Sequence, residues 1–93
     1  MSKVVLSGHI IVPDADLPSV LLELKTHIEL TRSENGCLIF EVTQNAENQN
    51  RFDVYEEFKD KRSFDNHQNR AGNSKWATVT KNVERHYEVA ELN

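Results

Sequence analysis

The sequence predicts an α+β fold in which helices cover one face of a four-stranded antiparallel sheet. Four segments alternate apolar and polar residues with the two-residue period of a strand, and the segments between them carry the spacing of amphipathic helices. The chain has 93 residues, of which 38% are hydrophobic and 28% charged, with only 3 Gly and 2 Pro. This composition is typical of one ordinary globular domain, so we expect residues 1–93 to form a single domain.

The first strand is predicted over residues 3–12. One of its faces is entirely apolar, whereas the other mixes Ser7 and His9 with Val5 and Ile11, which is unusual for a face given only to water. Pro13 stops this strand, and Asp16 is expected to cap the helix that follows. That helix carries its apolar residues at helical spacing: Leu17, Val20, Leu21, Leu24 and Ile28.

The middle of the chain predicts an antiparallel hairpin. Asn35-Gly36 supplies a left-handed stop for the first helix, after which residues 37–43 and 51–58 both alternate with the period of a strand. The residues between them, 44–50, are polar and form the expected turn.

The last third predicts two short helices and a final strand. Asp60 is expected to cap a helix that places Phe64, His67 and Ala71 on one face. Residues 72–74 (Gly-Asn-Ser) break it before a third helix, whose inward residues are Trp76, Val79, Thr80 and Val83. With residues 85–92 as the fourth strand, the order is βαββααβ, close to a ferredoxin-like fold.

The helices of such a fold cover only one face of the sheet. The other face, to which Ile39, Phe52 or Phe58 contributes according to strand register, is expected to expose several hundred Å² of apolar surface. A soluble monomer rarely tolerates such a patch. We therefore expect a two-fold homodimer packed sheet to sheet, with a cavity between sheet and helices in each subunit.

Charge and cysteine content exclude several classes of function. The formal net charge is −4, and the basic residues are scattered, which argues against nucleic-acid binding. The single Cys37 cannot form an internal disulfide, and a buried inert thiol is its expected state. There is no charged and apolar leader and no apolar run of membrane-spanning length, so the expected location is cytoplasmic, away from membranes.

Several motifs together resemble the antibiotic biosynthesis monooxygenase family. The segments are TRSENGCLIFEV (31–42), FDVYEEF (52–58) and the later His67. Members of that family typically carry an acidic residue, Gly-Cys-Leu, an aromatic residue, Glu-x-Trp and a helical His; the matching residues here are Glu34, Gly36, Cys37, Leu38, Phe40, Glu56 and His67. Phe58 replaces the family's Trp, and residues 68–75 lengthen the segment before Trp76.

The resemblance implies a dimeric α+β barrel with a ferredoxin-like protomer and a range of activities. These include oxygenases that convert anthrone-like or hydroquinone substrates into quinones without flavin, haem or metal. They also include an isomerase of a phosphorylated quorum-sensing signal, haem-degrading relatives, and members of no assigned activity. Haem degradation is disfavoured. This chain has His67 where the haem-degrading relatives carry Trp, and it has Ser7 or His9 where they carry Asn.

The leading hypothesis is a cofactor-independent monooxygenase of quinol-like or polycyclic phenols that reacts with O2. His67 is the candidate base, because its near-neutral pKa suits proton transfer and its helical face points toward the sheet. His9 and Ser7 are candidates to hold the substrate oxyanion, and Phe58, Phe64 and Trp76 to form an aromatic slot. Glu56 is either a pocket acid or a buried partner of Arg85 or His86.

Other interpretations stay open at this point. His67 is equally compatible with a structural role, and the three aromatic residues with plain core packing. No metal-ligand spacing and no Gly-rich nucleotide loop occurs, so neither metal nor cofactor is expected.

An isomerase would need a phosphate site, for which Arg51, Lys75 or Arg85 is the candidate cation. A non-catalytic binding dimer follows if the long segment 68–75 leaves the pocket open to water.

Overall fold

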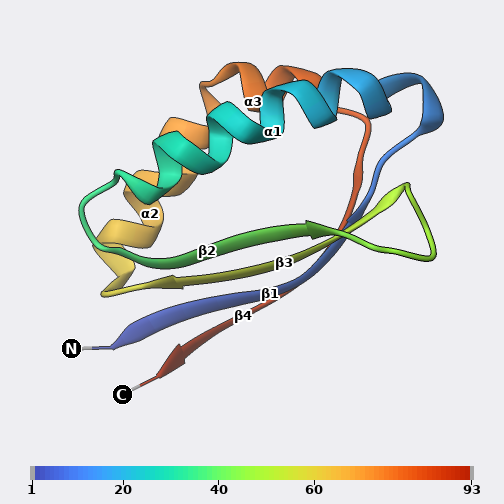
Figure 1. The fold of residues 1–93 in the computed structure, drawn as a ribbon. Helices are drawn as coiled ribbons and strands as arrows, with labels where there is room; N and C mark the ends of the chain where they lie inside the picture. The colour runs from blue at the N-terminus through green and yellow to red at the C-terminus, as the bar shows by residue number, and fades with distance from the viewer. Residues whose placement is uncertain (1, 93) are drawn as a thin grey trace.

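Four antiparallel strands form one sheet in the spatial order β2-β3-β1-β4, and all helices lie on one side of it (Figure 1). The computed structural model describes residues 2–92. Its elements are β1 (Lys3–Ile11), a 3-10 turn η1 (Asp14–Asp16), α1 (Leu17–Arg32), β2 (Cys37–Gln44), β3 (Arg51–Phe58), α2 (Lys61–Gly72), α3 (Lys75–Val79) and β4 (Glu84–Leu92). This is the predicted ferredoxin-like βαββααβ arrangement, so the fold prediction is confirmed.

The two faces of the sheet differ sharply in burial. On the helix side, the apolar residues of β1 and β3 pack against α1 and α3 in a core that includes Val12, Val20 and Phe52. Phe52 and Phe58 are both 0% exposed, so the expectation that either contributes to the open face is wrong. The register confirms the third candidate, Ile39, on the open face and adds Tyr55, each 36% exposed.

Four predicted helix ends had different outcomes. Asp60 caps α2 as predicted, because its side chain accepts a hydrogen bond from the backbone N–H of Ser63 at 2.8 Å. Asp16 precedes α1 but makes no such side-chain bond. Helix α1 ends at Arg32, before the Asn35-Gly36 stop, and α3 ends at Val79 and does not extend to Val83.

Gly36 has a specific steric role in the loop before β2. Its φ is +96°, a region that favours glycine, and an added Cβ would lie 2.2 Å from the Ser63 hydroxyl oxygen. The Gly36 carbonyl also accepts a hydrogen bond from the Lys59 backbone N–H at 2.8 Å. The loop after α1 therefore lies directly against the start of α2.

A β-bulge changes the facing of residues at the start of β2. The pairing with β3 shifts between Cys37 and Ile39, so Cys37 lies opposite Phe58 while Leu38 is 54% exposed. A one-residue shift moves a side chain to the other face of a sheet, which strict alternation over 37–43 did not anticipate. No helix within residues 2–92 is both long enough and apolar enough to span a membrane.

Candidate active site

A cavity of about 270 Å³ lies between the sheet and the helix layer. The sheet forms its floor through β1, β3 and β4, and the three helices form its walls. The side chains that give this cavity its chemistry are His27, Glu56, His67, Trp76, Arg85 and Tyr87; Leu6, Gln68, Ala71, Gly72, Ala77 and Thr80 complete the lining.

His67 projects from α2 and is only 3% exposed. Its Nδ1 lies 2.9 Å from a carboxylate oxygen of Glu34, and its Nε2 lies 3.9 Å from Oε1 of Glu56. A carboxylate at Nδ1 favours the tautomer in which Nδ1 donates its proton, which leaves the lone pair on Nε2. The imidazole is therefore arranged to accept a proton on the side that faces Glu56.

Glu34 is itself held by α2. The Arg70 guanidinium forms an ion pair and hydrogen bond with the second carboxylate oxygen of Glu34, and it also donates to the Thr31 hydroxyl at 2.9 Å. Burial lowers the pKa of His67 from its ordinary value, and the charge of Glu34 opposes that shift. The result is a connected Arg70–Glu34–His67 chain that orients a neutral imidazole.

Glu56 lies at the floor of the cavity and is 6% exposed. Its Oε1 is buried without a hydrogen-bond partner. Burial, together with the negative charge of Glu34, raises the pKa of Glu56 to about 7. Near neutral pH this carboxyl group can therefore either donate or accept a proton.

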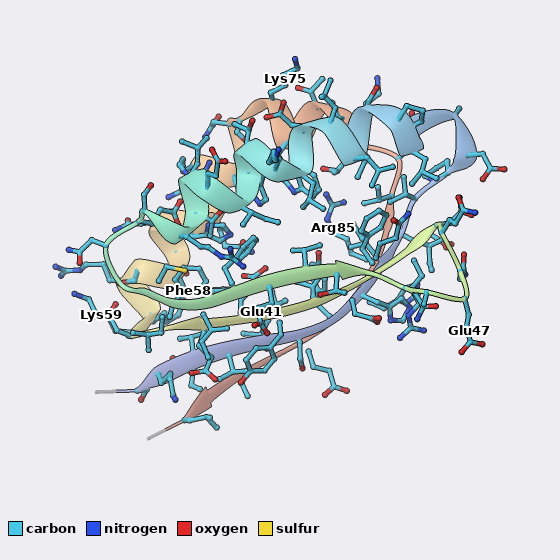
Figure 2. The ribbon with its side chains drawn as sticks, in the orientation of Figure 1. Glu41, Glu47, Phe58, Lys59, Lys75 and Arg85 are labelled. Atoms are coloured by element: carbon cyan, nitrogen blue, oxygen red, sulfur yellow. The ribbon has the colours of Figure 1, made fainter. Side chains whose placement is uncertain are left out.

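The cation and the phenol of β4 border the same cavity. Figure 2 shows Arg85 reaching from the sheet toward the helix layer, whereas Lys75 points outward from α3. Arg85 donates hydrogen bonds to the carbonyl and hydroxyl of Thr80 at 3.3 and 3.1 Å. Burial and the nearby Glu56 raise the pKa of Tyr87 to about 12, so its hydroxyl stays protonated.

The predicted aromatic slot is only partly assembled around the cavity. Of its three members, Trp76 lines the cavity. Phe58 stacks on the His67 ring with a centroid distance of 5.0 Å, and Phe64 packs edge-on against Phe58 at 5.8 Å. Phe58 and Phe64 therefore support His67 from behind, a packing role, while Trp76 borders the space a ligand could fill.

Ser7 and His9 lie on the opposite face of the sheet from this cavity. Both border a shallow depression on the open face with His86 and Glu88, and the rings of His9 and His86 stack at 4.7 Å. Because successive residues of a strand point to opposite faces, no rotation of these side chains brings them to His67. The structure thus does not group Ser7 and His9 with His67 and Glu56.

The candidate partners of Glu56 and of a phosphate also separate by face. His86 turns to the open face and Arg85 to the cavity, although neither is hydrogen-bonded to Oε1 of Glu56. Arg51 pairs with Asp53 at 3.0 Å. Of the three candidate phosphate cations, only Arg85 lines the cavity.

Sequence reasoning from the chain's patterns missed His27 as a cavity residue. His27 is 4% exposed, stacks flat on Trp76 at 4.6 Å and 5°, and continues the buried face of α1 from Val20 to Thr31. The helical spacing of Val20, Leu24, His27 and Thr31 carried that signal, but polar residues were not counted as inward-facing. Burial, together with the positive charges of Arg70 and of the protonated form of His67, lowers the pKa of His27 to about 3.

Within residues 2–92, no group of three or more His, Cys, Asp or Glu side chains is arranged to hold a metal ion. The cavity itself is lined by two imidazoles, one carboxyl group, one guanidinium, one phenol and one indole. Such a set can bind a polar aromatic molecule and move a proton to or from it.

Comparison with solved structures gives the same fold. A protein of unknown function from Bacteroides thetaiotaomicron, described as a possible oxidoreductase, matches with a TM-score of 0.82 at 15% identity, covering 98% of both chains. The Pseudomonas aeruginosa protein PA3566 matches with a TM-score of 0.75 at 18% identity, over 98% of this chain and 91% of its own. An antibiotic biosynthesis monooxygenase matches with a TM-score of 0.72 at 18% identity, over 100% of this chain and 97% of its own.

Sequence comparison gives the family. None of the curated proteins matches the sequence. The family model for antibiotic biosynthesis monooxygenases matches residues 4–79, which extends from β1 to the end of α3 and includes Glu34, Glu56 and His67. The chain belongs to the antibiotic biosynthesis monooxygenase family.

Proposed function

We propose that this protein is a cofactor-independent monooxygenase of small phenolic or quinol-like molecules. The observation that carries the proposal is the buried His67, whose Nδ1 is held by Glu34 while its Nε2 faces the carboxyl group of Glu56 beside the cavity. A general base needs an available lone pair and a ring held in a fixed orientation. Glu34 holds the His67 ring through Nδ1, and this leaves the lone pair on Nε2 available.

In this reaction His67 accepts the hydroxyl proton of the substrate, which leaves an electron-rich anion. The anion transfers an electron to O2, and the resulting radical pair combines into a peroxide anion at a ring carbon that carries hydrogen. The imidazolium of His67 returns its proton to this anion, which gives a hydroperoxide. His67 then removes the proton from that ring carbon, the O–O bond breaks as the carbonyl group forms, and the departing hydroxide takes up this proton, so one oxygen atom enters the product and the other leaves as water.

Arg85 and Glu56 take the part that Ser7 and His9 were expected to play. The guanidinium of Arg85 stabilises the substrate anion by its charge, and the protonated form of Glu56 can donate a hydrogen bond to it. Tyr87 and Trp76 line the space that this anion would occupy.

A second copy of the chain is proposed to cover the open face of the sheet. That face has no helix over it (Figure 1), and it combines Ile39, Tyr55 and Leu92 with the His9–His86 pair. Strand β4 is exposed along its whole length. These apolar residues lie among charged ones such as Glu41 and the Arg51–Asp53 pair, a mixture of apolar and polar groups that also occurs in subunit interfaces.

The test is oxygen uptake by metal-stripped protein with a panel of anthrones and hydroquinones, after subtraction of enzyme-free autoxidation. His67→Ala should lower kcat by roughly 10²- to 10⁴-fold, the usual contribution of a positioned general base. His9→Ala is the matched control, because it removes the same side chain from the opposite face; its rate should stay within about twofold of the wild type.

Uptake equal to autoxidation across the whole panel would refute the oxygenase proposal. Equal losses in the His67 and His9 variants would refute the assignment of the base.

An isomerase of a phosphorylated small molecule is the second candidate, and the presence of Arg85 in the cavity is the observation that favours it. A phosphate dianion would have Arg85 as its one cation there, since Lys75 points outward and Arg51 pairs with Asp53 (Figure 2). Isomerisation of sugar phosphates should therefore be absent, and its detection by NMR would favour the isomerase over the oxygenase.

A further inference from the structure

Two buried side-chain atoms in the described part of the chain lack a hydrogen-bond partner, and both belong to residues that line the same cavity. Among the side chains of residues 2–92, only Nδ1 of His27 and Oε1 of Glu56 are buried and unpaired. Both residues line the cavity, at 4% and 6% exposure. Leaving a buried polar atom unpaired typically costs about 1–3 kcal/mol, so two in one cavity call for an explanation.

We propose that His27 is a ligand-binding residue, whose imidazole forms a hydrogen bond with an oxygen substituent of the aromatic ligand. The ligand class is then an aromatic ring with at least two oxygen substituents, one bound at the Glu56 and His67 end and one at His27. This inference rests on the proposed function only in placing an aromatic ligand in the cavity, and it assigns His27 no part in proton transfer.

The surroundings of His27 hold its ring rigidly. The ring stacks on Trp76 at 4.6 Å, meets Phe40 edge-on at 5.4 Å and lies 5.9 Å from the ring of His67. A side chain fixed in this way loses little entropy when it binds a ligand, so one hydrogen bond from it adds both affinity and direction.

The charge state of His27 suits this role. With its pKa lowered to about 3, the imidazole stays neutral and keeps one N–H donor and one lone pair. It can therefore bond a hydroxyl group on a reduced ligand or a carbonyl oxygen on an oxidised one. A charged residue at the same place would strongly favour one of these two forms.

A purely structural role does not explain a histidine at position 27. Val20, on the same face of α1, is 0% exposed and shows that this face accepts an apolar side chain. A phenylalanine could keep the stack on Trp76 and would leave no polar atom unpaired. The ligand role and the structural role therefore predict opposite effects of His27→Phe on stability.

The experiment measures stability and binding separately. Unfolding by urea should show that His27→Phe is at least as stable as the wild type, since the unpaired atom is gone. Binding is followed anaerobically through the fluorescence of Trp76, the single tryptophan, with 1,4-dihydroxynaphthalene and 1-naphthol as probes. The variant should lose about tenfold in affinity for the diol and less than about twofold for the naphthol, the loss expected for one hydrogen bond. His9→Phe is the matched control and should change neither affinity.

A less stable His27→Phe variant with wild-type affinity for the diol would overturn the proposal, because that result describes a structural histidine. Absence of diol binding to the wild type at millimolar concentration would also overturn it. If the variant fails to fold, the ¹⁵N resonances of His27 in the wild type decide: diol must shift them and naphthol must not. Because no oxygen is present, these readouts stand even if the oxygenase proposal fails.

Discussion

A pair of neighbouring histidines lies on each side of the sheet, and the two pairs have different surroundings. His27 and His67 lie between the sheet and the helices with their ring centroids 5.9 Å apart, and both are nearly inaccessible. His9 and His86 stack at 4.7 Å on the open face, bordering a shallow depression. The two pairs are alike in residue type and proximity, but they differ in burial and in the partner that fixes the imidazole.

The buried pair comes from two helices, α1 and α2, whereas the open pair comes from two strands, β1 and β4. His67 has a carboxylate 2.9 Å from one nitrogen and an aromatic ring stacked at 5.0 Å. His9 has a second imidazole as its stacking partner, with the charged groups of Arg51 and Asp53 nearby on the neighbouring strand. Only the first environment can fix a tautomer and exclude water.

The largest expected difference between the two faces is in stability. Phe52→Ala should lower the free energy of unfolding by about 3–5 kcal/mol, because it empties a fully buried site in the core. Tyr55→Ala, on the open face of the same strand, should change the urea midpoint little at low protein concentration. Urea unfolding followed by circular dichroism measures both.

Protein concentration sharpens this comparison. If a second copy covers the open face, the cost of Tyr55→Ala should grow as the protein is concentrated. Sedimentation of both variants tests this directly: a chain that stays monomeric at all concentrations contradicts the proposed dimer.

The next effect concerns pH and the carboxyl group of Glu56. Its pKa is raised from 4.5 to about 7, so the folded chain holds a proton that the unfolded chain releases. The associated stability is fully present below pH 4.5 and is lost as the pH rises through 7. The side chain of Glu56→Gln does not titrate. Relative to this variant, the free energy of unfolding of the wild type should fall by about 3 kcal/mol as the pH rises from below 4.5 to above 7.

Urea unfolding of the two proteins at pH 4, 5.5, 7 and 8 measures the effect. A difference between wild type and Glu56→Gln that stays constant with pH would show that Glu56 titrates normally in the folded chain.

The smallest of the three effects tests the orientation of His67. Glu34→Gln keeps an oxygen that can accept from Nδ1 but removes the charge that stabilises the imidazolium, so kcat for oxygen uptake should fall by roughly tenfold or more. Glu41→Gln makes the same chemical change on the open face of β2 and serves as the control. The ¹⁵N shifts of His67 should report the Nδ1–H tautomer in the wild type, and finding the Nε2–H tautomer there would contradict the orientation.

Most of the fold was predictable, because it depends on patterns that repeat. The alternation in β1 and β3 and the helical spacing in α1 determine which residues meet, and the polar turn between β2 and β3 sets the hairpin. The exceptions were single-residue events. The bulge at the start of β2 and the early end of α3 leave no periodic trace in so few residues.

The site was less predictable, because its members come from segments far apart in the chain. His67 and Glu56 were found through the helical face and the family motif, whereas Ser7 and His9 were proposed from an unusual strand face without knowledge of what covers it. His27, Arg70 and Tyr87 come together with His67 only once α1, α2 and β4 are packed. No spacing along the sequence encodes such contacts.

The close approach at Gly36 makes the candidate base sensitive to distant changes. Glu34 lies two residues before Gly36, and Ser63 lies one turn before His67, so the contact between Gly36 and Ser63 acts as a spacer between base and carboxylate. The structure leaves no room for a methyl group between Gly36 and Ser63. Adding one at position 36 would push the loop and α2 apart and lengthen the 2.9 Å distance between His67 Nδ1 and the Glu34 carboxylate. A substitution of this glycine is therefore expected to move Glu34 away from His67 even in a chain that still folds.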